Sequence, residues 1–94
     1  MKYSLTFPTP LDMLDRANDN VDVFVELEDG KRYVFVVATP NNLSCLMRKD
    51  NIAYIKPGAP FLFVEELTEV NIRAVVEAVM EDPVLLHIYG EDLW

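Results

Sequence analysis

The chain is organised around two runs of alternating apolar and polar residues between Val21 and Thr39, joined by Asp29 and Gly30. Alternation with a period of two is typical of strands that bury one face. An Asp-Gly pair between runs rich in valine and aromatic residues is typical of a tight hairpin turn, because such turns need residues that accept a positive φ. The pattern therefore predicts a central β-hairpin over residues 21–39.

The length of the turn decides which side chains of the hairpin share a face. If Asp29 and Gly30 are the only loop residues, Val25 lies opposite Val34, and the valines of the first run face the core. The opposite face then combines aromatic rings with carboxylates, and its members are Asp22, Phe24, Glu26, Tyr33 and Phe35. A solvated face would be polar throughout, so these five residues are predicted to contact a partner, unless a helix of the same chain or a second copy covers their rings.

Four further segments have the pattern of strands. The segment 3–7 alternates apolar and polar residues, and 52–55 is short and mainly apolar. The segments 61–64 and 84–89 are apolar on both sides, which is typical of strands in the interior of a sheet. Pro83, directly before the last of these, is predicted to end a helix.

Three segments have the pattern of helices. Thr9 and Pro10 suit the N-cap and the first position of a short helix over 9–17. A second helix is predicted over 43–49, and the strongest signal extends over 69–82, where apolar residues recur every three or four positions. Together the elements predict one globular domain over residues 1–94. Its fold class is α+β: a small single-layer sheet, mixed or mainly antiparallel, around the central hairpin 21–39 and packed with two to three helices.

The charge of the chain narrows the classes of partner. Sixteen acidic and eight basic side chains give a formal net charge of -8, and the isoelectric point is near 4.4. A surface of this sign is repelled by phosphate backbones and by anionic lipid head groups, so neither nucleic acid nor membrane is predicted as a partner. A basic protein would be attracted, although acidity also serves simply to keep a domain in solution.

The composition offers little for a catalytic or metal site. Cys45 is the only cysteine, so no internal disulfide is possible, and the N-terminal segment lacks the apolar core of a signal peptide. These features predict a cytoplasmic location. His87, the only histidine, is predicted to lie in a strand, and nothing in its spacing from Cys45 indicates a nucleophilic pair. The sequence therefore predicts no catalytic residue, no cofactor and no metal site.

The acidic segments are explained by local structure. The run 15–26 lacks the ligand spacing and the glycine of a calcium-binding EF-hand loop. Glu65, Glu66 and Glu69 stand at a helix start, where carboxylates are locally favourable. Since no catalytic or metal site is predicted, we expect the protein to act through contact of its surface with another protein.

The sequence predicts a non-enzymatic protein-binding module with a basic partner, comparable in size and charge to an immunity protein or antitoxin that inhibits a nuclease. One alternative is a homodimeric structural or housekeeping domain in which the sheet pairs with its copy. A small enzyme that uses His87 is the other. Trp94, at the end of the chain, is predicted either to dock on the core or to contact a partner.

Overall fold

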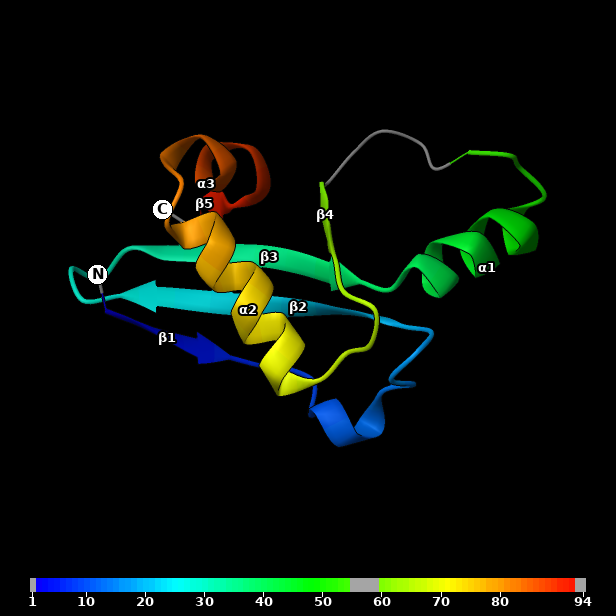
Figure 1. Ribbon diagram of the computed structural model, residues 1–94, viewed down its shortest axis with the longest axis horizontal. Coiled ribbons are helices and arrows are strands. Elements are labelled where there is room, and N and C mark those ends of the chain that lie inside the picture. The colour runs from blue at the N-terminus through cyan, green and yellow to red at the C-terminus, as the bar shows by residue number, and fades with distance from the viewer. Residues whose placement is uncertain (1, 55–59, 93–94) are drawn as a thin grey trace.

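The computed structural model describes residues 2–54 and 60–92. It has a small α+β fold in which one mixed sheet is accompanied by three α-helices, so the predicted fold class is confirmed (Figure 1). In chain order the elements are β1 (Tyr3–Thr6), the 3-10 helix η1 (Leu11–Met13), β2 (Asn20–Leu27), β3 (Arg32–Ala38), α1 (Pro40–Asp50), β4 (Phe61–Phe63), α2 (Glu69–Met80), α3 (Pro83–Tyr89) and β5 (Glu91–Asp92).

The sheet is built around β3. Strands β1, β2, β3 and β4 follow one another in this order, and the two-residue strand β5 pairs with β3 as well. The pairs β1 with β2, β2 with β3 and β3 with β5 are antiparallel, whereas β3 and β4 are parallel. One edge of β3 is therefore paired with β2, and the other is shared between β4 and β5.

The loop of the central hairpin has three residues, not the two that were predicted. The amide of Leu27 donates to the carbonyl of Lys31 at 2.8 Å, and the amide of Gly30 donates to the carbonyl of Leu27 at 3.0 Å. Gly30 has a φ of 89°, as in a hairpin loop whose third residue adopts a left-handed conformation. The Asp29 carboxylate accepts a hydrogen bond from the amide of Lys31 at 3.0 Å, which holds the loop closed.

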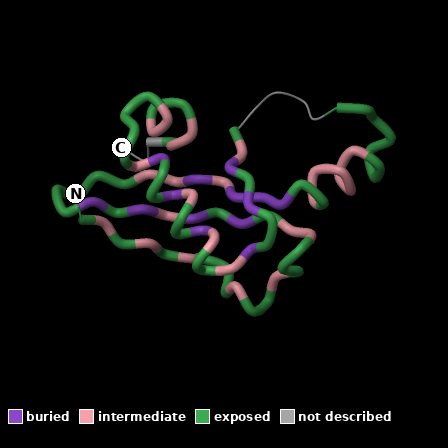
Figure 2. Tube along the Cα trace, viewed as in Figure 1, coloured by how far each residue is buried: buried purple, intermediate pink, exposed green. Residues whose placement is uncertain are grey.

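The extra loop residue shifts the register by one position. Val25 lies opposite Tyr33 and Val23 lies opposite Phe35, so the predicted pairing of Val25 with Val34 is wrong. Side chains alternate between the faces of a strand, so this shift exchanges the two faces of β3 relative to β2. Buried positions alternate with exposed or half-buried ones along β2, and with half-buried ones in the middle of β3 (Figure 2).

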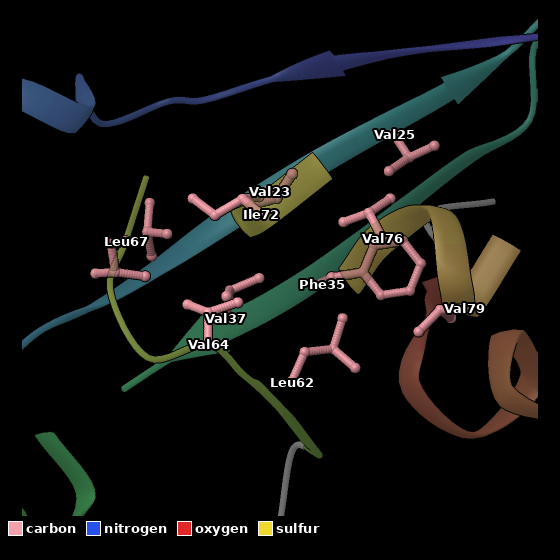
Figure 3. Close-up of a cluster of buried hydrophobic side chains, with 11 residues drawn as sticks. Val23, Val25, Phe35, Val37, Leu62, Val64, Leu67, Ile72, Val76 and Val79 are labelled. Atoms are coloured by element: carbon pink, nitrogen blue, oxygen red, sulfur yellow. The ribbon is translucent and has the colours of Figure 1, made fainter. Parts of the chain in front are cut away.

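The core lies between one face of the sheet and α2, and we call this side the core face. Ile72 and Val76 of α2 are fully buried against Val23 and Phe35 (Figure 3). Thr68 caps α2 by accepting a hydrogen bond from the amide of Asn71 at 3.2 Å, so the predicted start of this helix is confirmed. The buried cluster consists of Val21, Val23, Val25, Phe35, Val37, Leu62, Val64, Leu67, Ile72, Val76 and Val79.

The segment 84–89 was predicted as a strand but is part of the helix α3. Asp82 caps this helix, because its carboxylate accepts hydrogen bonds from the amides of Val84 at 3.0 Å and Leu85 at 3.4 Å. Pro83 occupies the first turn, where its missing N–H costs nothing. Pro83 thus marks the beginning of α3 as well as the end of α2.

Three other predicted elements differ in the structure. The helix expected over 9–17 is reduced to the single turn η1, in which Pro10 takes the N-cap position and makes no side-chain cap. Helix α1 begins at Pro40, three residues before its predicted start, and is capped by Thr39. Residues 52–54 form no strand. Ile55, the last position of that prediction, lies outside the described residues, as does Trp94.

Candidate functional site

The structure divides the five predicted binding residues between the two faces of the sheet. Phe35 is 0% exposed in the core, and Tyr33 is half-buried beside it. Asp22, Phe24 and Glu26 lie on the opposite face, where Phe24 is half-buried and both carboxylates are exposed. The predicted face therefore does not exist as one surface, because the register that defined it is shifted by one residue.

The face opposite α2, which we call the open face, still combines aromatic rings with carboxylates. Apart from the buried Ala38, its side chains are exposed or half-buried. Its members, from the strand pairings, are Ser4, Thr6, Asn20, Asp22, Phe24, Glu26, Arg32, Val34, Val36, Ala38, Phe61, Phe63 and Glu91.

The pairings arrange the open face in rows that run across the strands. One central row joins Phe24 to Val34, and Val34 is in turn paired with Glu91 of β5. The next row joins Asp22 to Val36 and Phe61. Paired side chains on one face of a sheet are direct neighbours, so an apolar centre is bordered by a carboxylate at either end.

Phe63 extends this apolar centre along β4 and is the most exposed ring on the open face, with 51% of its surface accessible. Phe63 was not among the predicted binding residues, and neither were Val34, Val36 and Phe61. The run 61–64 was interpreted as buried on both sides. In the strand β4, however, the middle residue Leu62 is buried and Phe63 is exposed. Burial alternates along β4 as in other strands. Because all three of its residues are apolar, the sequence alone does not reveal this alternation.

In the described part of the chain, two hollows can be placed on this face. The first, which we call the β5 hollow, has a volume of about 310 Å³. Its lining residues are Val34, Val36, Pro60, Ile88, Tyr89, Gly90 and Glu91. The second measures about 340 Å³, lies on the other side of Phe24, and is lined by Thr6, Phe24, Val25, Glu26 and Arg32.

The second hollow contains an ion pair between β2 and β3. The guanidinium Nε of Arg32 lies 3.0 Å from a carboxylate oxygen of Glu26, and more than half of each side chain is exposed. Exposed ion pairs of this kind stabilise a protein by about 1 kcal/mol at most. A partner can therefore separate these two charges at little cost.

His87 lies in the last turn of α3 and is exposed. It is not among the residues that line the two hollows of the open face, nor those of a third hollow formed by residues 2–4 and 26–28. Cys45 belongs to α1, which Figure 1 shows beyond the end of the sheet and away from α3. The structure thus does not bring this cysteine and this histidine together.

Cys45 has polar neighbours of its own. Its Sγ accepts hydrogen bonds from the guanidinium of Arg48 at 3.4 Å and from the side-chain amide of Asn18 at 3.2 Å. The Arg48 hydrogen bond, followed by that of Asn18, lowers the pKa of the Cys45 thiol below its ordinary value because both donors favour the thiolate. The bond from Asn18 also fastens α1 to the loop before β2.

Neither a metal centre nor a membrane helix is found in the described part of the chain. No group of three or more histidine, cysteine, aspartate or glutamate side chains among residues 2–54 and 60–92 is arranged to hold a metal ion. Within the same ranges, every helix is too short or too polar to cross a bilayer. Comparison of the chain with models of known families, with curated proteins and with solved structures finds no match in any of the three.

Proposed function

We propose that the protein is a non-enzymatic binding module of the cytoplasm that recognises a basic protein through the open face of its sheet. The observation that carries the proposal is the accessible apolar centre of this face, with Phe63 at 51% exposure and carboxylates at its border. Interfaces commonly place aromatic residues in the middle and charged residues at the rim. The open face has this arrangement.

The charge of the molecule supports a basic partner. The chain carries a net charge of -8. Among the described residues of the open face, the three carboxylates of Asp22, Glu26 and Glu91 stand against the single cation of Arg32. A negative surface attracts a positive protein over several ångströms and raises the rate of encounter. An immunity protein or antitoxin that inhibits a nuclease acts in this way, since the partner's nucleic-acid site is itself basic.

A homodimer that pairs the open faces is the second candidate, and the apolar centre favours it too. Symmetric pairing would bring together two copies of one surface, on which carboxylates outnumber cations among the described residues. Like charges in contact oppose association. The charge distribution therefore favours the basic protein over the second copy.

The test compares the wild-type protein with a variant of the open face and a control variant away from it. Phe63→Ser removes the exposed ring, whereas Val70→Ser changes α2 at a position that is 78% exposed and makes no part of the open face. Each protein is immobilised, exposed to a lysate of its source at low and high salt, and any retained protein is identified, purified and titrated calorimetrically.

We expect one basic protein to bind the wild type and Val70→Ser alike and to bind Phe63→Ser about tenfold more weakly, which is the cost of losing a central aromatic contact. High salt should weaken the wild-type complex. A retained protein that is acidic, or one that binds Phe63→Ser as tightly as the wild type, would contradict the proposal. So would sedimentation of the wild type as a dimer that Phe63→Ser converts to a monomer, since the second copy would then be the occupant.

A further inference from the structure

We infer that the β5 hollow is an anchoring site for an arginine side chain of the partner. The inference rests on the proposed function and adds to it the chemistry of one contact.

The hollow exists because two strands share one edge of β3. Val34 is paired with Glu91 of β5, and Val36 is paired with Phe61 of β4. Strands β4 and β5 both begin beside this part of β3. The residues just before them, Pro60 before β4 and Ile88 to Gly90 before β5, form the walls of the hollow. The side chains of Val34 and Val36 lie on the open face and form the floor.

The wall next to β5 is closely packed and keeps the hollow in place. A Cβ atom on Gly90 would lie 2.8 Å from the carbonyl oxygen of Leu86 and 3.3 Å from a ring carbon of Phe35. The Gly90 amide donates to that same carbonyl at 2.9 Å, at the end of α3. Because Phe35 is fully buried, this wall is anchored directly to the core.

The lining combines apolar walls with one charge. Val34, Val36, Pro60 and Ile88 are apolar, and Ile88 is 52% exposed. Glu91 is exposed, and among the described residues of the lining it supplies the only carboxylate and none is cationic. A volume of about 310 Å³ is at the lower end of the range for small-molecule sites, so it suits one long side chain better than a cofactor.

An arginine side chain fits both features of this lining, its apolar walls and its carboxylate. Its three methylene groups can lie along apolar walls while its charged end remains at the rim, as long basic side chains commonly do. Its planar guanidinium forms two parallel hydrogen bonds to a carboxylate, which an ammonium group cannot do. A purely apolar side chain would instead cover Glu91 and leave its charge without a partner, which is costly.

The test uses two small probes in place of the partner. N-acetyl-L-arginine methylamide carries the proposed side chain, and N-acetyl-L-citrulline methylamide has nearly the same shape without the charge. Each is titrated into the ¹⁵N-labelled protein at low salt, and amide shifts are followed by NMR. The variants are Glu91→Gln and, as a matched control outside the hollow, Glu81→Gln at the C-terminal end of α2.

We expect the arginine probe to bind with a dissociation constant of about 1 mM, the affinity typical of a ligand with this number of atoms. Shifts should concentrate on the amides of Val34, Val36 and Glu91. The citrulline probe, and the arginine probe with Glu91→Gln, should each bind about fivefold more weakly, whereas Glu81→Gln should match the wild type. The spectrum of Glu91→Gln without probe shows whether the fold is kept.

Equal binding of the two probes, shifts centred away from the hollow, or unchanged binding by Glu91→Gln would overturn the inference. The outcome is separable from that of the proposed function. If a basic protein binds through Phe63 but the arginine probe does not occupy the hollow, only the anchoring site is wrong. If the probe occupies the hollow and no basic protein depends on Phe63, the anchoring chemistry stands and the proposed function falls.

Discussion

Phe24 and Phe35 show how a single residue in a turn decides the role of a side chain. They lie on neighbouring strands, and a two-residue loop would place them opposite each other on one face. With Gly30 as a third loop residue, Phe24 pairs with Val34 and Phe35 pairs with Val23. One ring therefore lies on the open face and the other is in the core.

The two phenylalanines give a test of the register at the residue scale. Phe35→Ala should lower the free energy of unfolding by about 3–5 kcal/mol, because it leaves a cavity among fully buried side chains. Phe24→Ala should cost much less, since Phe24 is only half-buried. Urea denaturation of both variants measures the difference, and similar losses would mean that the rings share one environment.

The sequence leaves this choice open for a physical reason. An Asp-Gly pair is compatible both with a two-residue turn and with a three-residue loop that has glycine in its last position. Both solutions bury a row of apolar residues on β3, because Val34 and Val36 are as apolar as Phe35 and Val37. The existence of the hairpin was therefore predictable, but the face on which each β3 residue lies was not. The candidate site inherited the error, so Tyr33 and Phe35 were misplaced.

At the scale of elements, a capping residue followed directly by proline is a signal for the start of a helix, and it occurs three times in this chain. Thr39 with Pro40 begins α1, and Asp82 with Pro83 begins α3. Only Thr9 with Pro10 was interpreted in this way, and there the chain makes a single 3-10 turn. The segment after Pro83 was assigned to a strand because its residues are apolar on both sides.

The helical pattern of α3 is nevertheless present in the sequence. Leu85, Leu86 and Tyr89 pack against the core, and their spacing is that of one side of a helix. Val84 and Ile88 are exposed on the other side, at 66% and 52%. Because these exposed residues are apolar as well, the two sides look alike by hydropathy and only the cap distinguishes helix from strand. Helix α2 was predictable because polar residues mark its outer side.

We predict that Asp82 is necessary for the stability of α3. Asp82→Ala removes the acceptor for the amides of Val84 and Leu85, and loss of such a cap costs about 1 kcal/mol. Glu81→Ala is the control, because Glu81 is adjacent and exposed but caps nothing by its side chain. Denaturant unfolding should show a loss for Asp82→Ala alone. An equal loss in the control would show that the helix does not depend on this cap.

At the scale of the whole molecule, the excess of negative charge acts on stability as well as on partner choice. A net charge of -8 on 94 residues opposes the compact state by self-repulsion. Burial, which is the larger cause, and the nearby carboxylates of Glu77 and Glu81 raise the pKa of Tyr3 above its ordinary value, because both disfavour a negative tyrosinate.

Salt should therefore stabilise the protein, and reversal of the charge at one position should reduce that dependence. Raising the salt concentration to about 0.1 M shortens the screening length to about 10 Å, so the free energy of unfolding should rise. Glu81→Lys changes the net charge by two and places a cation at the negative end of α2, a gain of about 0.5 kcal/mol. Thermal unfolding at several salt concentrations measures both effects. A stability that does not change with salt would show that self-repulsion is negligible.

The lengths of the strands limit how this sheet meets another protein. Its inner strands β2 and β3 have eight and seven residues, whereas β1, β4 and β5, which carry its outer edges in the described part of the chain, have four, three and two. Short edges give a foreign peptide few backbone groups with which to continue the ladder, a common protection against aggregation. Recognition by strand addition is thus disfavoured, and selectivity for a partner has to reside in side chains, where substitution can retune it without disturbing the hydrogen-bonded framework.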